Sequence, residues 1–323
     1  MSLLRAFIQE ATRRMDIVVS MAAGGFTGVM VLKDEYYAKN VITVEGHEGK
    51  PGSLTPLDTE SEQLGYDVIK SIKVDKVHAV FVNYFTTKRP EVISKGTPLL
   101  CQGVFIGVPY CFRFKSADEI KTADLQFFDR GVDLDTENVQ NLFDTMIYTE
   151  LEKKFAVSQE LFNKYSYLAL LQPTSAAVAA TVWYIVCYFF FNPMFYIKRH
   201  VSLRNRAFLY FICNCIGVKI ALWGHNRLLQ FRDHLTIRKT VDADKEMALA
   251  GLTYYQKCLE RNKMLYSLPG SAFKDKLDSQ GNFLYPIYEQ RISLTNRHLY
   301  LMETLKRKGL LVAGNCGKMD LSV

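Results

Sequence analysis

Apolar residues along this chain are concentrated in three blocks, which polar and charged segments separate. The longest block, residues 168–191, has 24 residues and no charged side chain, and a helix of that length crosses about 30 Å of hydrocarbon. A second block at 207–224 has 18 residues and includes Asn214 and Lys219, and a third at 17–32 is short and rich in small residues. The pattern therefore predicts about three transmembrane helices, the last two of which form a hairpin.

Two of these blocks also have a second interpretation. A buried core helix is the alternative for 168–191, and a cleaved signal or targeting segment is the alternative for 17–32. The basic segment 1–16 resembles a mitochondrial targeting helix, and a plain juxtamembrane helix is its alternative. The loop 192–206 carries four basic residues and no acid. By the positive-inside rule, this loop and the N-terminus lie on one side of the membrane, and residues 33–167 and 225–323 lie on the other.

The segments 33–167 and 225–323 have the patterns of folded structure. Alternating β-branched and aromatic residues predict a strand at 76–85 and one or two strands at 99–114. Helical spacing of apolar residues recurs at 64–73, 138–167, 244–266 and 295–308, and the sequence Asp278–Asn282 predicts a turn. We therefore expect an α+β membrane protein, whose soluble domain is built from the segments that flank the hairpin and ends in a helical tail.

Composition and charge narrow the classes of function. With 49% hydrophobic and 23% charged residues, the average composition is that of a globular protein. The net charge of +7 is small for the dense basic face of a nucleic-acid-binding protein, and it suits a protein beside an anionic lipid surface. The seven cysteines include no CxxC pair. Cys101 and Cys111 lie in one β-like region, and whether they form a disulfide stays open.

Common catalytic and cofactor motifs are missing from the sequence. It has no GxGxxG, P-loop, GxSxG or HExxH pattern, and no histidine has another four residues away. Asp242 and Asp244 have no further carboxylates at the spacing of a calcium-binding loop, and acids there are favourable at the start of a helix. We therefore expect no bound cofactor and no metal ion.

A set of residues scattered over most of the chain resembles the transmembrane protein 177 family. It comprises Phe85–Thr87, Gly107–Pro109, Phe112, Ala248, Ala250, Gly251, Tyr254, Tyr255, Lys257, Leu259, Asn262, Leu265, Leu268, Gly270, Asp278, Gly281, Asn282, Pro286, Thr295 and Arg297. The resemblance implies a mitochondrial inner-membrane protein, with 1–16 and 192–206 in the matrix and the two soluble segments in the intermembrane space. It also implies two partners, because the family is associated with early maturation of cytochrome c oxidase subunit II and with the stability of that subunit's assembly chaperone.

The order of elements also resembles the integral-membrane HExxH zinc peptidases of the CAAX-protease type. Val104–Phe112 corresponds to their strand, and their metal-ligand positions hold Gln159, Asn163 and Thr240 on this chain. Only Glu160, at the position of the general base, is retained. Neutral amides and a hydroxyl cannot replace imidazole and carboxylate ligands of zinc, so this resemblance implies a degenerate peptidase fold with a lost zinc site. A coincidental order of elements is the alternative.

We expect a non-enzymatic assembly factor that holds a newly inserted membrane client, with an extended client segment added beside Val104–Phe112. The alternative is a membrane-embedded, metallopeptidase-like enzyme with an atypical or lost metal site. A small-solute transporter is disfavoured, because Lys219 is the only charged residue within the three apolar blocks. The blocks therefore offer few side chains to line a solute pathway.

Overall fold

The structure is a computed structural model, and the residues that it describes are 59–72, 82–87, 89–97, 103–122, 137–166, 168, 178–179, 182–183, 185–186, 202–268, 273–287 and 289–310. The chain divides into two compact units. Unit 1 takes Met1–Tyr36, Tyr167–Leu229 and Ile287–Glu289, and unit 2 takes Tyr37–Ser166, Gln230–Pro286 and Gln290–Val323. Segments that are far apart in the sequence therefore fold together in unit 2.

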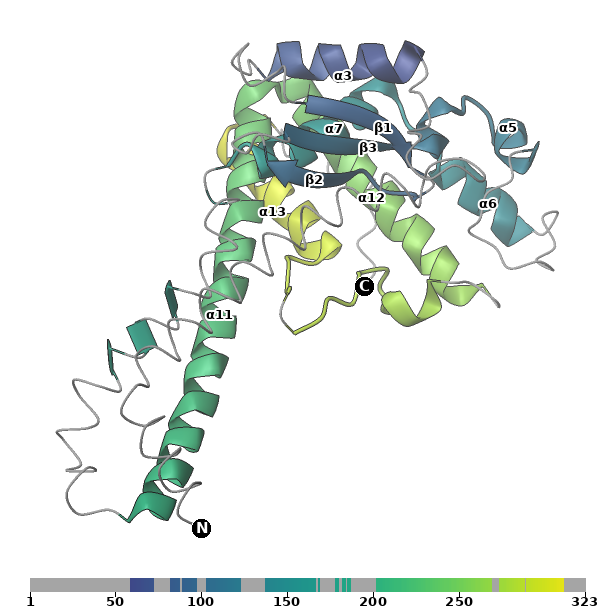
Figure 1. Cartoon of the computed structure of the whole chain (residues 1–323). Helices are drawn as coiled ribbons and strands as arrows, with labels where there is room; N and C mark the ends of the chain where they lie inside the picture. Colours follow the sequence, from purple (N-terminus) through teal and green to yellow (C-terminus); the bar gives the residue numbers. More distant parts are fainter. Residues whose placement is uncertain are drawn as a thin grey trace, which may run out of the picture. The chain divides into compact units, whose positions relative to one another are not determined.

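The described part of unit 2 consists of helices and a small sheet (Figure 1). The strands are β1 (Val82–Thr87), β2 (Ile93–Thr97) and β3 (Gly103–Pro109). The helices are α3 (Thr59–Ser71), α5 (Ala117–Thr122), α6 (Glu137–Thr145), α7 (Glu150–Lys164), α12 (Lys245–Ser267) and α13 (Leu294–Arg307), with the short 3-10 helices η1 (Tyr110–Arg113) and η3 (Lys274–Lys276). The 41-residue helix α11 (Leu203–Ala243) contributes its residues up to Leu229 to unit 1 and the rest to unit 2.

β3 is the central strand of the sheet. The strand order is β1-β3-β2, with β1 parallel and β2 antiparallel to β3. Nearly all residues of β3 are buried, as a short apolar run predicts for an inner strand. Both sides of β3 are therefore paired, and the predicted addition of a client segment beside Val104–Phe112 is wrong. The sequence pattern missed β2, because its residues Ile-Ser-Lys-Gly-Thr do not alternate between apolar and polar.

Helix α7 packs against the sheet, and it contacts β2, β3, α3 and α12 (Figure 1). It begins at a capping box, in which Thr149 accepts a hydrogen bond from the Glu152 backbone N–H and the Glu152 carboxylate accepts one from the Thr149 N–H. The single helix predicted over 138–167 is therefore two helices, α6 and α7. The chain turns between them, where Met146 and Tyr148 are buried in the core.

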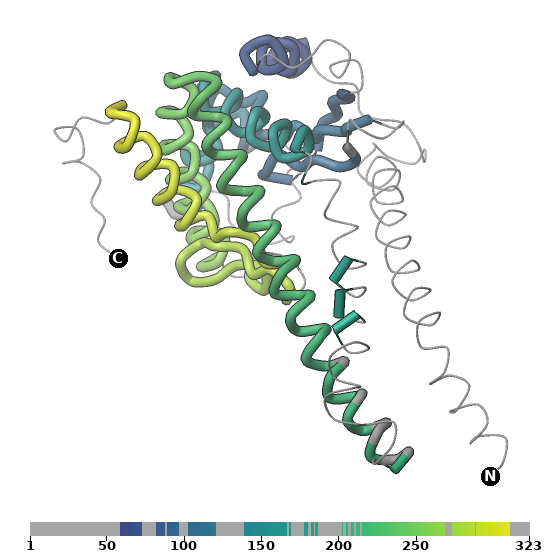
Figure 2. Tube along the Cα trace, turned by 90° about the vertical axis from the view of Figure 1, so that its left-hand side faces the viewer, coloured from purple at the N-terminus to yellow at the C-terminus, as the bar shows by residue number. Residues whose placement is uncertain are grey.

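Helix α12 confirms the helix predicted at 244–266, and it packs beside α7 and α13 (Figure 2). Asp244, predicted at a helix start, is its N-cap and accepts hydrogen bonds from two backbone N–H groups of the first turn. Helices α7 and α12 approach closely where Gly251 faces the ring of Phe155. A Cβ added to Gly251 would lie 2.3 Å from that ring, so the contact requires glycine.

The predicted turn at Asp278–Asn282 is confirmed, and it ties α12 to α13. The Asp278 carboxylate accepts from the backbone N–H of Asn282, and Asn282 Oδ1 accepts from the backbone N–H of Thr295 at the start of α13. Gly281 has a φ of +84°, and its carbonyl accepts from the side chain of Asn262 in α12. Several residues that carry the family resemblance therefore serve this packing.

The predicted fold class, an α+β protein with about three transmembrane helices, is wrong. The described residues are mostly helical with one small sheet, and none of their helices combines the length and the apolar character that a membrane crossing requires. Residues 207–224 belong to α11, where Asn214 and Lys219 interrupt the apolar run and the helix continues through polar residues. Residues 17–32 and most of 168–191 lie outside the described residues.

Cys111 is a free thiol in the buried core of unit 2. Burial raises the pKa of this thiol to about 12, so it is protonated at neutral pH and a poor nucleophile. Cys101, which the sequence analysis considered as a disulfide partner of Cys111, lies outside the described residues.

Replacing Gly251 with alanine tests the contact between α7 and α12. Because the added methyl group overlaps the Phe155 ring, we expect Gly251→Ala to lower the free energy of unfolding by about 1–3 kcal/mol. Gly224→Ala is the matched control, since Gly224 also lies inside a helix and no described atom is within 4 Å of its added Cβ. Alanine at that position should stabilise by up to about 1 kcal/mol. Denaturant unfolding measures both variants, and equal stabilities would contradict the close approach.

Candidate functional site

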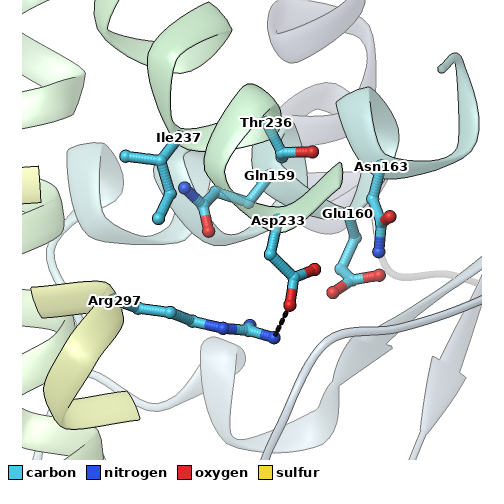
Figure 3. Close-up of a pocket in the computed structure, with 7 residues that line it drawn as sticks. All are labelled: Gln159, Glu160, Asn163, Asp233, Thr236, Ile237 and Arg297. Atoms are coloured by element: carbon cyan, nitrogen blue, oxygen red, sulfur yellow. Dashed lines mark hydrogen bonds and ion pairs between the residues drawn. The ribbon is translucent and has the colours of Figure 1, made fainter. Parts of the chain in front are cut away.

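A polar recess lies where α7, α11 and α13 meet in unit 2 (Figure 3). Its cavity is small, about 10 Å³, which is room for about one water molecule. Its lining residues are Gln159, Glu160 and Asn163 of α7, Asp233, Thr236 and Ile237 of α11, and Arg297 of α13.

Helical spacing brings the three α7 residues to the recess. Gln159 and Asn163 are one turn apart on the same face of α7, with Glu160 next to them. The Glu160 carboxylate accepts a hydrogen bond from the hydroxyl of Ser94 in β2, and Gln159 Oε1 accepts one from the hydroxyl of Tyr255 in α12. Burial raises the pKa of Tyr255, which keeps its hydroxyl protonated as a donor. Neighbouring elements therefore fix two of the three side chains.

A buried ion pair joins α13 to α11 at the recess. Arg297 Nη2 lies 2.9 Å from Asp233 Oδ2, and these two side chains are 14% and 5% exposed. The backbone of Ile292 also bonds to both, since its N–H donates to Asp233 and its carbonyl accepts from Arg297 Nε. Burial by itself lowers the pKa of Arg297, but the Asp233 carboxylate raises it above its ordinary value. Arg297 is therefore a cation at neutral pH.

Two further buried arginines lie near the recess. Arg261 of α12 donates from Nη1 to the carbonyl of Pro90 and the hydroxyl of Tyr148, and its Nη2 lies 3.3 Å from Glu91. Because Pro90 and Glu91 lead into β2, Arg261 holds the start of that strand against α12. Arg232 of α11 is 1% exposed, and burial lowers its pKa to about 10, which leaves it cationic at neutral pH.

A larger cavity with a mixed polar and apolar lining adjoins the recess and shares Gln159, Glu160 and Arg297 with it. Its volume is about 60 Å³, which is room for several water molecules or one small side chain. Its other lining residues are the charged Glu91 and a set of apolar and aromatic residues. The set comprises Val92, Ala156, Tyr254, Tyr255, Cys258, Phe283, Tyr285 and Leu294. Polar side chains therefore line both cavities, and the larger one also has apolar walls.

Two polar atoms of residues that line the recess have no hydrogen-bond partner among the residues that the structure describes. They are Gln159 Nε2, a donor, and Asn163 Oδ1, an acceptor. Asn163 is only 4% exposed. A buried polar group without a partner destabilises a protein by about 1–3 kcal/mol, so such groups are uncommon and call for an explanation.

Three of the four predicted relic positions, those on α7, line the recess. The fourth, Thr240, does not line it: the residue is fully buried on α11, and its hydroxyl donates to the carbonyl of Thr236. Sequence reasoning missed Asp233 and Arg297 as site residues. Arg297 belongs to the pattern that resembles the family, whereas no signal in the sequence pointed to Asp233.

The donor set at these positions does not fit zinc. Neutral amides stand at two of the ligand positions, and the hydroxyl of Thr240 is bonded to the backbone. Of the two carboxylates in the recess, Asp233 is paired with Arg297 and Glu160 accepts from Ser94. Across the described ranges, no three His, Cys, Asp or Glu side chains are grouped as a metal site requires. The arrangement suits hydrogen bonding to a polar ligand.

Removing one partner of the Asp233–Arg297 pair tests its role. Because Arg297→Met removes the ion-pair partner of the buried Asp233, we expect the free energy of unfolding to fall by about 3–5 kcal/mol. The double variant Arg297→Met, Asp233→Leu should recover most of that loss, since both charges of the pair are then absent. Arg307→Met is the control: its pair with Glu303 is 75% and 58% exposed, so the loss should stay below about 1 kcal/mol. Additive losses in the double variant, measured by denaturant unfolding, would contradict the pairing.

Comparison with known proteins gives one consistent match. The family model for Transmembrane protein 177 matches residues 54–284, which include the α7 and α11 residues of the recess. The chain is 24% identical over 272 residues to Transmembrane protein 177 of Danio rerio, which covers 82% of this chain and 84% of that relative. It is 24% identical over 201 residues to Transmembrane protein 177 of Xenopus laevis, which covers 60% of this chain and 62% of that relative.

No solved structure matches the chain. The family match extends over more than half of the sequence, and it confirms the resemblance that the scattered residues indicated. The chain therefore belongs to the transmembrane protein 177 family, whose name identifies its members as membrane proteins.

Proposed function

We propose that this protein is a non-enzymatic factor of the mitochondrial inner membrane that assists the early maturation of cytochrome c oxidase subunit II. In this proposal it stabilises the newly made subunit and that subunit's assembly chaperone. Membership of the transmembrane protein 177 family supports the proposal, because the family resemblance implies both partners.

The observation that carries the proposal is the chemistry of the recess. Positions that hold metal ligands in the zinc peptidases hold the amides of Gln159 and Asn163 here, and amides bind through hydrogen bonds. Two ion pairs lie around it: Asp233 and Arg297 are both buried, and the buried Arg261 pairs with the half-buried Glu91. Ion pairs and amides without a set of zinc ligands suit a binding protein better than a zinc enzyme.

Exposed apolar side chains on α11 support a location at a membrane. Phe208, Phe211 and Trp223 are 66%, 65% and 63% exposed, and Ile216 and Val218 are also exposed. Large exposed apolar patches are typical of interaction surfaces, because the contact of apolar side chains with water is unfavourable in free energy. The proposal assigns these side chains to contact with inner-membrane lipid.

A second candidate function is an enzyme of the membrane metallopeptidase type with an atypical or lost metal site. What favours it is that two carboxylates, Glu160 and Asp233, line the same recess (Figure 3). Two carboxylates in one site can share the roles of general acid and general base. The two candidates differ in what they require of Glu160.

Glu160→Gln separates the two candidates. Glutamine keeps the size of the side chain and an oxygen that accepts from Ser94, but it cannot act as a general base. In cells that lack the protein, we expect the variant to restore subunit II to about the wild-type level, whereas a lost general base would reduce activity by about 100-fold or more. Immunoblotting of subunit II measures the rescue, with Glu246→Gln on the exposed surface of α12 as the control. Complete loss of rescue at an unchanged level of the variant would favour the enzyme.

Copurification tests the two partners directly. From mitochondria that contain the tagged full-length chain, we expect subunit II and its assembly chaperone to copurify with it. In cells without the protein, pulse-chase labelling should show faster degradation of newly made subunit II. Normal lifetimes of subunit II and of its chaperone in those cells would refute the proposal.

A further inference from the structure

We infer that His298 makes the packing of α13 sensitive to pH: when its imidazole takes up a proton, α13 loosens from α12 and α11. The inference is independent of the proposed function. It rests on the position of His298 in the helix packing and on the groups that surround its ring.

The inner face of α13 is an apolar stripe that one histidine interrupts. Leu294, Leu301 and Leu305 are 7%, 0% and 0% exposed, and His298 is 8% exposed. Because successive members of this set are three or four residues apart, their side chains lie on one face of the helix. α13 packs mainly against α12 (Figure 2), and the three leucines belong to the core of unit 2. His298 therefore occupies a core position.

The ring of His298 is poorly placed to carry a second proton. Its Nε2 atom is buried and has no hydrogen-bond partner among the described residues. A neutral imidazole carries a proton on one nitrogen only, whereas the cation carries one on both. Protonation therefore puts a donor at Nε2, where the described protein atoms offer no acceptor. An enclosed water molecule can accept that proton, but it does not replace the bulk water that stabilises a cation.

The neighbours of His298 along α13 offer no counter-charge. Residues three and four positions away lie next to it on the helix surface, and all of them are uncharged: Leu294, Thr295, Leu301 and Met302. Burial lowers the pKa of His298 below its ordinary value. The neutral ring is therefore the form that fits the packed helix.

The titratable groups of α11 that face α13 already have partners there. The pairs are Asp233 with Arg297, Asp242 with Lys308 and, as an edge-to-face ring contact, His234 with Tyr300. Arg232, a further buried residue of α11, is a cation and offers no counter-charge. Burial lowers the pKa of the half-buried His234 as well, but the Asp233 carboxylate opposes that shift. We therefore assign the larger effect of pH to His298.

The titratable groups of α12 also offer no nearby anion. Its buried ones are Tyr254, Tyr255, Cys258 and Arg261. Burial raises the pKa of both tyrosines and of the thiol, so these groups are neutral at neutral and mildly acidic pH, and the arginine is a cation. Of the two acids of α12, Glu246 is exposed and Glu260 accepts from the exposed Gln256. Neither is placed in the core beside His298.

Acid weakens the packing of α13 through this side chain. A histidine in a detached helix has a pKa of about 6.5, whereas burial lowers the pKa of His298 in the packed helix. Between these two values the detached form binds the proton more tightly. The packing is therefore at full strength above about pH 6.5 and weakens as the pH falls toward the lower value.

Loosening of α13 opens the larger cavity beside the recess. Leu294 and Arg297 of α13 form part of its wall. The sheet and α7 contact each other directly, so they can keep their packing when α13 moves. The change is therefore local to α13 and to the cavity that it borders.

Hydrogen–deuterium exchange of the full-length protein in detergent micelles, at about pH 7.5 and 5.5, tests the inference. After correction for the intrinsic exchange rates, we expect the protection of the α13 amides to fall by up to about tenfold at the lower pH. That is the change in proton uptake by a detached histidine over this range. The amides of α7 and the sheet should keep their protection. Equal protection of α13 at both pH values, or an equal loss in α7 and α13, would overturn the inference.

Two variants of His298 assign the effect to this residue. His298→Leu completes the apolar stripe, and His298→Gln keeps a neutral polar side chain that takes up no proton. In both, we expect the acid-induced loss of α13 protection to disappear. On acidification, the unfolding temperature of the wild type should fall by about 2–4 °C more than that of either variant, the equivalent of a tenfold change.

His234→Gln is the matched control, because it removes the other histidine beside α13. This variant should keep most of the acid-induced loss of protection. A loss that persists in both His298 variants, or one that disappears in His234→Gln alone, would overturn the assignment to His298.

Discussion

The close approach of α7 and α12 positions the other parts of the recess. Gly251 lets the ring of Phe155 lie directly against α12, at a distance that no other residue would allow. One turn further along α12, Tyr255 reaches Gln159 with its hydroxyl, and Arg261 reaches the segment that leads into β2. The helix that carries the amides and the strand that borders them are therefore both held by α12.

Charged groups and amide groups around the recess differ in whether they have a partner. The charged ones are paired, and removing either partner of such a pair is strongly destabilising. Gln159 Nε2 and Asn163 Oδ1 have no hydrogen-bond partner among the described residues, and neither do His234 Nδ1 and His298 Nε2 outside the recess. Ordered water molecules are expected at such atoms, because a bridging water satisfies polar groups that the protein itself leaves without a partner.

Local patterns in the sequence predicted local structure well. The helices at 244–266 and 295–308 and the turn at Asp278–Asn282 are present, because helix caps, apolar periodicity and turn residues act within a few residues of each other. The sequence analysis missed β2, because its apolar and polar residues do not alternate. This strand forms through its pairing with β3. The membrane-spanning helices were predicted from apolar runs, but 207–224 belongs to a helix that continues far beyond its apolar part.

The sequence by itself determined the family and the identities of the α7 residues at the site. Only the tertiary structure decided which partners these residues meet: Ser94 reaches Glu160 across 66 positions of the sequence, and Arg297 reaches Asp233 across 64. No periodicity connects residues so far apart, and a single Asp or Arg in a helix has the same pattern whether it faces water or a buried partner. The recess exists because α7, α11 and α13 pack at one place, and that packing depends on the shape and burial of the whole core.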